Sequence, residues 1–420
     1  ELYYCVDTFV NQLKKGINEL NFQIKVKLGG SYAKDTYLKN DFDIDIFLIF
    51  QNYCSDEEKE EKMRTLFDLI SIDYGVKYGS RRYFYGTYRV NNEIKFNFEC
   101  VPTQFYEDIL KIENSTDASV YHVDFFNSQK KENSELQNEV RIAKQWFKTQ
   151  GLYGAESYIG GFSGHAIECL IIKFKTFENL ILYLSNVSKN SKLTFSTIHS
   201  SFEITKDKQS ALIIQDPIIY NRNALSALED SMFYKARYKS ILAIKNGLKK
   251  EDFKQLEIDY KKIKEKAIND NNMPIMMIEL LFSNTEETND SIGSKSKKII
   301  QNVVKYLSKV GFDVLLKDFI YDINEDKILG IIEFKSLEIS SYTYREGPSL
   351  ELGLDIISNF LNNNSNKDIM IIKDKLFVKE RREIFSIKDF ANRFNNKEAF
   401  LANFFNKEFK SLKELNINYN

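Results

Sequence analysis

The stretches LGGSYAKD at residues 28–35 and DFDIDIFLIF at residues 41–50 decide the fold of this chain. Residues 24–28 and 41–50 are rich in β-branched and aromatic side chains, which predicts two strands. The glycine pair after the first strand lets the backbone turn sharply and approach a ligand closely at the start of a short helix. This stretch therefore predicts an anion site, to which Lys34 adds a positive charge suited to a phosphate.

The second strand carries paired acidic residues. Residues two apart on a strand project from the same face, so Asp43 and Asp45 point together while Ile44 and Ile46 point into the core. Asp41 shares the acidic side but lies at the mouth of the strand. Two neighbouring carboxylates repel each other, so the pair predicts a cation between them.

A third carboxylate is expected from Glu99, in the strand predicted at residues 93–101. Its neighbours are large and apolar, and burying an unpaired carboxylate among them is unfavourable. Two Mg²⁺ ions about 3.5–4 Å apart, as an in-line displacement uses them, need such a third acid. Asp43, Asp45 and Glu99 are therefore the predicted metal ligands and catalytic residues.

Each motif is ambiguous alone, since Gly-Gly-Ser is most often a turn and Asp-x-Asp most often a solvated face. Their combination, with a strand carboxylate further along, resembles the nucleotidyltransferase superfamily that includes DNA polymerase β. The resemblance implies an α+β fold with a polymerase β-like nucleotidyltransferase head. A helical central domain and a C-terminal α+β RNA-binding body and tail would follow.

Composition excludes several other classes. The 420 residues include 59 Lys and Arg against 60 Asp and Glu, so no global basic field marks a nucleic-acid binder. An apolar content of 43% excludes wholesale disorder. Four cysteines without CxxC spacing and only three histidines argue against structural zinc and favour a reducing compartment, so we expect a cytoplasmic protein. No apolar run is long enough to span a membrane.

Periodicity divides the chain into a mixed sheet with helices at 1–127, a helical region at 128–255 and an α+β region at 256–420. In the first region we expect helices at 7–20 and 55–72 and strands at 82–90 and 93–101, joined by a turn at Asn91-Asn92. Beyond it we expect helices at 135–149, 224–245, 250–268 and 295–310, and a further helix that starts after an N-cap at Ser163 and ends at residue 174. We also expect strands at 274–282, 313–321 and 327–337.

The chain also resembles a narrower group, the archaeal-type (class I) CCA-adding enzymes, which are tRNA nucleotidyltransferases. GGSYAKDTYLKNDFDIDIFLIF at 29–50 is similar to that family's loop and metal-binding strand. NEVRIAK at 138–144, GLYGAE at 151–156 and GFSG at 161–164 resemble its neck region. Asp216-Pro217 with Arg222-Asn223, and REGP at 345–348, resemble later blocks. The resemblance spans nearly the whole chain and is patchy after residue 250.

The resemblance implies a role for each matching residue. The turn at Gly30 with Ser31 and Lys34 would hold the triphosphate of the incoming nucleotide. Lys144 and Tyr153 would add to this clamp from the helical region. His122 would also contact the nucleotide, and Arg222 would read the Watson–Crick edge of the base.

Two residues depart from the family pattern. Lys34 stands where the family often has Arg, which keeps the charge but weakens bidentate phosphate contact. Glu99 stands where the family usually has Asp, and its longer arm changes the geometry available to a metal. A chain with Glu99 unable to bind metal would be weakly active or inactive.

The implied activity is template-independent addition and repair of the 3′-terminal CCA of tRNA with CTP and ATP. In it, the RNA 3′-hydroxyl attacks the nucleotide α-phosphate at a two-metal site and pyrophosphate leaves. The expected partners are the tRNA acceptor stem and 3′ end, ATP and CTP, and no membrane association is expected. The sequence does not decide for or against a homodimer. The alternatives are another terminal transferase (adenylyl, uridylyl or oligoadenylate-type) and a catalytically lapsed RNA-binding protein.

The RNA contacts are expected in the third region. Its sheet could face RNA, and its basic side chains would grip the RNA backbone. Because the net charge is near zero, we expect weak nonspecific RNA binding with marked salt dependence. The basic candidates are Lys295, Lys297, Lys298, Lys379, Arg381 and Arg382.

Overall fold

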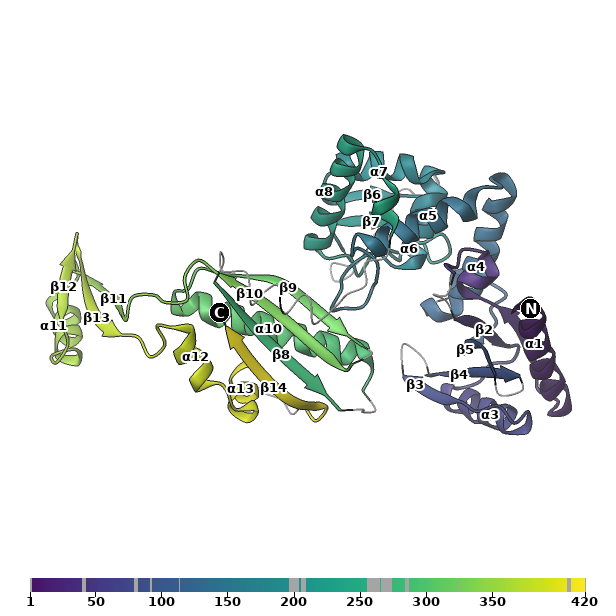
Figure 1. Cartoon of the computed structure of the whole chain (residues 1–420), viewed down its shortest axis with the longest axis horizontal. Coiled ribbons are helices and arrows are strands. Elements are labelled where there is room, and N and C mark those ends of the chain that lie inside the picture. Colours follow the sequence, from purple (N-terminus) through teal and green to yellow (C-terminus); the bar gives the residue numbers. More distant parts are fainter. Residues whose placement is uncertain are drawn as a thin grey trace. The chain divides into compact units, whose positions relative to one another are not determined.

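The computed structural model describes residues 2–419 except 40–42, 79–81, 91–92, 113, 196–203, 205–208, 255–264, 266–273, 284–286, 324 and 406–408. Contacts divide the chain into two compact units, Glu1–Leu256 and Glu257–Asn420. Helices and strands mix in both units (Figure 1), which confirms the expected α+β class. None of the described helices is long and apolar enough to cross a membrane.

The first unit contains a five-stranded sheet in the order β1-β2-β5-β4-β3. Its central pair, β2 and β5, is parallel, whereas the other neighbours are antiparallel. The predicted strands at 24–28, 82–90 and 93–101 are all present. The turn expected at Asn91-Asn92 lies outside the described residues, although β4 and β5 pair as a hairpin would. The strands are β1 (Ile24–Leu28), β2 (Ile44–Phe50), β3 (Gly75–Tyr78), β4 (Arg82–Val90) and β5 (Glu93–Gln104).

Helices cover both faces of this sheet. On one face, Ile44 and Ile46 of β2 are fully buried in a cluster with Phe9 and Phe67. On the other face, Phe47 packs with residues of α4. The alternation along β2 therefore leaves Asp43 and Asp45 on the second face, as the sequence predicted. The helices of this part are α1 (Leu2–Glu19), α2 (Gly30–Lys34), α3 (Asp56–Leu69), α4 (Ser115–Glu132) and the short 3-10 helix η1 (Ile109–Lys111).

The helical part of the first unit surrounds its own core, which contains Trp146, Phe147 and Phe162. Ser163 caps the helix that follows it by accepting a hydrogen bond from the Ala166 N–H at 3.0 Å, as predicted. The elements are α5 (Leu136–Thr149), α6 (Gly164–Phe174), α7 (Phe177–Asn186), α8 (Asp230–Asn246), the 3-10 helix η3 (Lys250–Phe253), and the parallel pair β6 (Ser191–Leu193) and β7 (Leu212–Ile214).

The second unit holds an antiparallel sheet in the order β14-β8-β10-β9 and a separate three-stranded sheet in the order β11-β13-β12. The predicted order of strand, helix, strand, strand is confirmed. The elements are β8 (Ile275–Phe282), α10 (Asn289–Val310), β9 (Val314–Asp322), β10 (Lys327–Phe334), β11 (Tyr342–Ser349), α11 (Leu354–Asn363), β12 (Ile369–Ile372), β13 (Lys375–Arg381), α12 (Ile387–Arg393), α13 (Lys397–Phe404) and β14 (Leu412–Tyr419).

Several predicted boundaries were wrong, among them that of the helix expected at 7–20, which begins at Leu2. The helix expected at 224–245 begins only at Asp230, because Asn223 accepts hydrogen bonds from the Ile214 and Leu225 N–H groups and holds a turn there. The helix expected at 295–310 begins earlier, after an N-cap at Thr288. Of the helix expected at 250–268, residues 250–253 form a 3-10 turn, and most of the remainder lies outside the described residues.

The predicted three-domain division stays a prediction. Its first limit, at residue 127, lies within α4.

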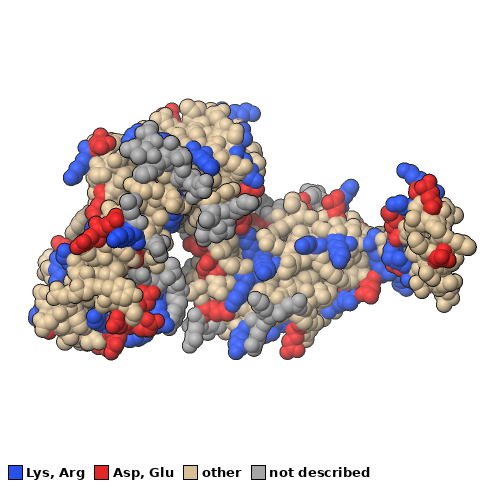
Figure 2. Space-filling model, turned by 180° about the vertical axis from the view of Figure 1, so that it is seen from behind, with Lys and Arg blue, Asp and Glu red and all other residues tan. Residues whose placement is uncertain are grey.

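All four cysteines, Cys5, Cys54, Cys100 and Cys169, are buried and free. Lys and Arg side chains alternate with Asp and Glu over the face shown in Figure 2, in keeping with the formal net charge of −1.

Candidate active site

The acidic residues meet where β2 and β5 run side by side. Asp45 lies directly opposite Glu99 in the parallel register of these strands. Both side chains are partly buried, while Asp43, just before β2, is exposed. The parallel pairing therefore brings together carboxylates that are 54 residues apart in sequence.

These carboxylates stand close enough to raise one another's pKa. Burial, the Glu99 carboxylate and then Asp43 raise the pKa of Asp45 to about 7. Burial and Asp43 also raise the pKa of Glu99. A cation bound among the three would relieve this repulsion, and carboxylate oxygens are the ligands that hard divalent ions prefer. The donor set therefore fits a divalent metal ion.

The glycine turn closes tightly over this acidic pair. The Gly29 N–H donates to the Asp45 carbonyl oxygen at 2.7 Å. Gly30 has a left-handed backbone with φ of +56°, and a Cβ at this position would lie 1.5 Å from Asp45 Oδ2. Only glycine leaves room for that carboxylate, so the turn and the acidic strand form one structure.

A cleft of about 460 Å³ opens beside the turn. Residues from the sheet, from the start of α4 and from the helical part line it. Its described lining also includes Tyr83, Ser119 and His165, which were not predicted. Four predicted residues, Ser31, Asp43, Lys144 and Tyr153, are not part of the described lining. The predicted residues that do line the cleft are Gly30, Lys34, Asp45, Glu99, His122 and Arg222.

Two of the predicted triphosphate ligands share a buried carboxylate. Lys34 Nζ donates to Glu168 Oε2 at 2.7 Å, and Lys144 Nζ donates to Glu168 Oε1 at 2.8 Å. Thr36 bridges the group, since its hydroxyl donates to Glu168 Oε1 at 3.0 Å and accepts from Lys144 at 3.0 Å. All four side chains are buried.

The charges in this group stabilise one another. Burial alone would raise the pKa of Glu168, but the ammonium groups of Lys144 and Lys34 outweigh it and hold the pKa well below its usual range. Burial lowers the pKa of Lys144, and Glu168 opposes that shift. The sequence prediction missed Glu168. Its signal was a lone acid in the otherwise apolar segment AIECLII of α6, where burial requires a cationic partner.

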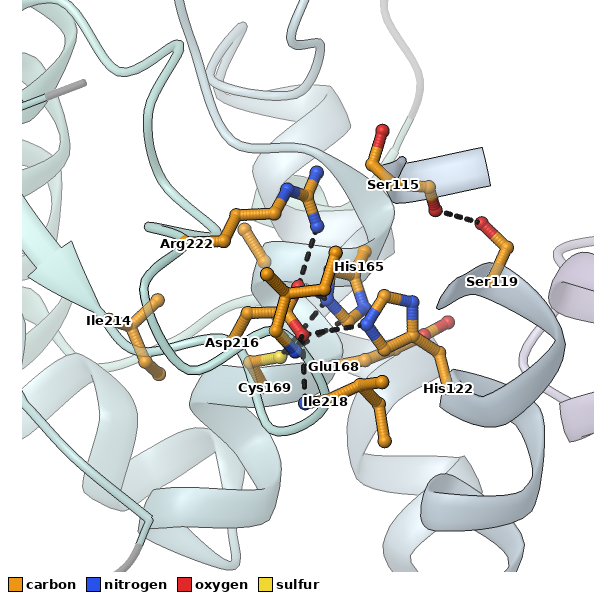
Figure 3. A network of polar contacts seen from close by, with 12 residues as sticks. Ser115, Ser119, His122, His165, Glu168, Cys169, Ile214, Asp216, Ile218 and Arg222 are labelled. Atoms are coloured by element: carbon orange, nitrogen blue, oxygen red, sulfur yellow. Dashed lines mark hydrogen bonds and ion pairs between the residues drawn. The ribbon is translucent and has the colours of Figure 1, made fainter. Parts of the chain in front are cut away.

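A second buried carboxylate, Asp216, contacts three residues of the cleft lining, His122, His165 and Arg222 (Figure 3). It accepts hydrogen bonds from His122 Nε2 at 2.8 Å and from His165 Nε2 at 3.2 Å. Arg222 Nη1 donates at 2.6 Å to Asp216 Oδ2, the oxygen that also accepts from His165. The Ile218 and Ile219 N–H groups complete the set at 2.9 and 3.1 Å. Asp216 thus fixes both histidines and the arginine that faces the cleft.

His122 remains neutral in this arrangement. Burial and the neighbouring His165 lower the pKa of His122 to about 4. Burial would raise the pKa of Asp216, but the hydrogen bonds from the histidines hold it far below its usual range. The ligand atoms of His122, His165 and Asp216 lie within 4.8 Å of one another, as a metal site requires. Because both rings donate their N–H to Asp216 and Arg222 balances its charge, we interpret this group as a hydrogen-bond network.

Tyr153 lies on the helical side near Lys144. A Cβ added to Gly164 would approach the Tyr153 hydroxyl at 2.9 Å and Lys144 Nζ at 3.7 Å, so Gly164 separates the two polar groups. Lys148 Nζ lies 4.7 Å from the centre of the Tyr153 ring. The ring packs against the helical core. The structure therefore places Tyr153 next to the lysine network.

Comparisons with known families match three successive segments of the chain. Residues 10–147 match the nucleotidyltransferase domain, and residues 138–253 match the second domain of tRNA nucleotidyltransferase. Residues 274–403 match the C-terminal domain of the CCA-adding enzyme. A CCA-adding enzyme of Methanococcus maripaludis strain C5 is 27% identical over 80% of this chain and 75% of its own length. That of Nanoarchaeum equitans is 28% identical over 86% and 83%.

The chain belongs to the archaeal-type CCA-adding enzyme family. The predicted resemblance and the nucleotidyltransferase fold of the first part are thereby confirmed. Membership implies the use of a divalent metal ion. Among solved structures, Cid1, described as an RNA terminal uridylyl transferase, matches with a TM-score of 0.48 and 12% identity, covering 61% of this chain and 93% of its own. This chain matches CCA-adding enzymes over most of its length, including its C-terminal part.

Proposed function

We propose that this chain adds and repairs the 3′-terminal CCA of tRNA, using CTP and ATP. The observation that supports the proposal most is that the acidic pair Asp45 and Glu99, the Gly30 turn, Lys34 and Arg222 line one cleft. A cleft with carboxylates on one wall and cations on the others suits a nucleoside triphosphate. The match of the C-terminal part to CCA-adding enzymes supports tRNA as the RNA substrate.

Asp43, Asp45 and Glu99 would hold Mg²⁺. When bound there, Mg²⁺ favours deprotonation of the RNA 3′-hydroxyl and neutralises charge on the departing pyrophosphate. The raised pKa of Asp45 and of Glu99 supports a cation at this position, because burial and then the neighbouring carboxylates disfavour the charged forms of both side chains.

The remaining residues bind and orient the nucleotide. Lys34 supplies a positive charge beside the acidic pair. Ser31 lies in the same short helix, so the triphosphate would lie along α2. Lys144 and Tyr153 support this side from the helical part. Charge-assisted contacts of this kind fix the phosphates for attack at the α position.

Arg222 and His122 would receive the base and sugar. The Arg222 guanidinium has five N–H donors, and Asp216 takes one of them. The others can donate to acceptors on cytosine or adenine. His122 is held as a neutral ring whose Nε2–H is directed at Asp216, so its position does not depend on its own charge. Both line the same cleft as Lys34.

The proposal also places the RNA grip in the second unit. Of its six basic candidates, Lys295 pairs with Glu287 at 2.5 Å, Arg382 donates to the Val310 carbonyl and Lys379 lies over the Tyr342 ring. Lys298 on α10 is exposed and suited to a phosphate. The cytoplasmic location and the homodimer stay predictions.

The test is single-nucleotide sizing of products from a tRNA transcript that lacks CCA, incubated with Mg²⁺ and the chain. We expect two added residues with CTP alone and a third only when ATP is also present. Asp45→Asn should abolish incorporation, whereas Asp68→Asn, on an exposed carboxylate of α3, should not. Untemplated addition to any RNA end would instead support a general terminal transferase. No incorporation at all would support a lapsed RNA-binding protein.

A further inference from the structure

A groove of about 330 Å³ lies in the second unit, where α10 and α13 contact each other. Its described lining comes from the second unit alone. On α10 the lining recurs at residues 302, 305, 306 and 309, a spacing that puts these side chains on one face of the helix. Residues 403–405, at the end of α13, complete the lining. The groove therefore needs no contribution from the catalytic cleft.

Lys305 and Lys309 give the groove an excess of positive charge. Both side chains are exposed, and neither has a carboxylate partner in the part of the chain that the structure describes. Lys295 of the same helix, in contrast, pairs with Glu287 at 2.5 Å. The described lining of the groove contains no Asp or Glu. Two ammonium groups four residues apart on a helix suit a phosphate, because its charge relieves their mutual repulsion.

Asn302 adds a hydrogen-bond acceptor that is held in a fixed orientation. Its Nδ2 donates to the Phe404 carbonyl oxygen at 2.8 Å, which ties α10 to α13 and fixes the amide. Its Oδ1 accepts no hydrogen bond from a described residue, and the side chain lines the groove. An acceptor beside two ammonium groups suits a ligand that carries a hydroxyl donor next to a phosphate.

The aromatic part of the lining is held by the core of the second unit. Tyr306 packs edge-on against Phe394 and Phe404, with ring centres 5.9 and 5.5 Å apart. The ring is partly buried, as is that of Phe405. Together they offer apolar surface beside the polar groups, against which the carbon atoms of a sugar can pack.

We propose that this groove binds the sugar–phosphate backbone of RNA. A phosphate lies between Lys305 and Lys309, and a ribose 2′-hydroxyl donates to Asn302 Oδ1. The 2′-hydroxyl is the group by which a protein distinguishes RNA from DNA at a given site. The inference deepens the proposed function, on which it rests, by assigning a contact surface for tRNA.

The position of Lys298 extends this surface along the helix. Residues 298, 302, 305 and 309 are separated by four, three and four residues, so they share one face of α10 over about 16 Å. Because the proposed contacts are to phosphate and sugar, they position the RNA without reading its bases.

The experiment measures equilibrium binding of the full chain to a tRNA transcript that lacks CCA, and to DNA of the same sequence, at several salt concentrations. The lysine variant carries Lys305→Gln together with Lys309→Gln. We expect it to weaken tRNA binding at least fourfold at 100 mM salt and to reduce the slope of log affinity against log salt by about 2. Asn302→Ala should weaken tRNA binding about two- to fivefold without changing the slope, and should leave DNA binding unchanged.

The matched control is Lys14→Gln together with Lys15→Gln. Both lysines are exposed on α1 in the first unit, so this variant loses the same charge as the lysine variant. We expect its affinity for tRNA and its salt slope to match those of the unsubstituted chain. A loss equal to that of the lysine variant would show an effect of total charge and overturn the proposal.

Unchanged tRNA binding in the lysine variant would also overturn the proposal. Equal weakening of RNA and DNA binding by Asn302→Ala would do so too, because it would exclude a contact to the 2′-hydroxyl. A raised KM for CTP in the lysine variant would show that the groove holds a free nucleotide instead of RNA.

Urea denaturation of each variant accompanies the binding, since Asn302→Ala also removes the hydrogen bond to Phe404. The lysine variant changes only exposed side chains, so it tests the phosphate contact even if Asn302→Ala fails to fold. Binding is measured without nucleotide incorporation. A chain that binds tRNA through the groove but adds no nucleotide would therefore contradict the proposed function and leave the groove in place.

Discussion

At Gly30 the backbone is left-handed, and the missing side chain leaves the space that the Asp45 carboxylate occupies. Gly30→Ala would force a Cβ into the space of the Asp45 carboxylate and strain a left-handed backbone. We expect the variant to lose at least 100-fold in nucleotide incorporation and about 2 kcal/mol in free energy of unfolding. Single-turnover incorporation and urea denaturation would measure the two effects.

Gly247→Ala separates the two causes. Gly247 also has a positive φ of +71°, but nothing lies within 4 Å of the Cβ position. This variant should lose stability through the backbone alone, by about 1 kcal/mol, and keep full activity. If Gly30→Ala behaved in the same way, the tight contact with Asp45 would have no catalytic importance.

Asp45 gives the chain a pH-dependent stability when no metal is bound. Its pKa is about 7 in the folded chain and about 4 when unfolded, so between these values the folded state holds more protons. Metal-free stability should therefore fall as pH rises from about 4 to 7. At pH 8 in a chelator, Asp45→Asn should melt about 3 °C higher than the unsubstituted chain, equivalent to about 1 kcal/mol.

Calorimetry at two pH values would check this. At pH 4 the difference between the two proteins should shrink, because Asp45 is then protonated. Adding Mg²⁺ at pH 8 should raise the melting temperature of the unsubstituted chain more than that of Asp45→Asn. Equal melting temperatures at pH 8 without metal would contradict the raised pKa.

The carboxylates could be predicted at this scale because the two-residue period of a strand fixes which side chains share a face. His165, Glu168 and the five hydrogen bonds to Asp216 could not. They depend on α4, α6 and the segment after β7 meeting in space, and nothing in the local pattern states which buried charge finds which partner.

Among the elements, α6 has the most consequence for the site because it carries both His165 and Glu168. Its first turn is fixed by the Ser163 hydroxyl. Ser163→Ala should cost about 1 kcal/mol in urea denaturation, as removal of an N-cap usually does. Because the first turn includes His165, we also expect the KM for ATP to rise two- to fivefold.

Ser55→Ala is the matched comparison. Ser55 forms a capping box with Glu58 at the start of α3, on the other side of the sheet from the cleft. It should lose similar stability without a change in KM. An identical change of KM in both variants would mean that the effect is general destabilisation.

Most elements could be predicted from periodicity, and the errors have local causes. The start of α8 was misplaced because Ala224 and Leu225 are buried by a turn that Asn223 holds, so their apolar character suggested a helix. The small sheet of β11, β12 and β13 was not predicted. Its strands β11 and β12 contain no buried residue, and only β13, with Leu376 and Val378 buried, shows a buried side.

At the scale of the whole molecule, near-neutral charge implies that RNA is held by a few local contacts. Lys298→Ala should weaken tRNA binding two- to fivefold at 100 mM salt and reduce the slope of log affinity against log salt by about 1. The KM for ATP should not change. Filter binding at several salt concentrations would measure this.

Lys15→Ala serves as the control, since Lys15 is an exposed lysine of α1 in the first unit. It should leave both the affinity and the slope unchanged. If Lys15 and Lys298 had equal effects, tRNA binding would follow total charge instead of a defined surface.

The order of strands in the five-stranded and four-stranded sheets lay beyond sequence reasoning. Nothing local states that β2 and β5 pair in parallel, or that β14, at the end of the chain, adds to the edge of β8. These pairings join segments far apart in sequence, and they decide which predicted side chains meet.

The burial of all four cysteines makes the folded chain nearly inert to thiol reagents. A cysteine introduced at an exposed position would therefore be the main reactive thiol, without removal of the native ones. Two such positions, one in Glu1–Leu256 and one in Glu257–Asn420, would accept a pair of dyes. Energy transfer between them would then report, in a single molecule, the distance between the two dyes as each nucleotide is added.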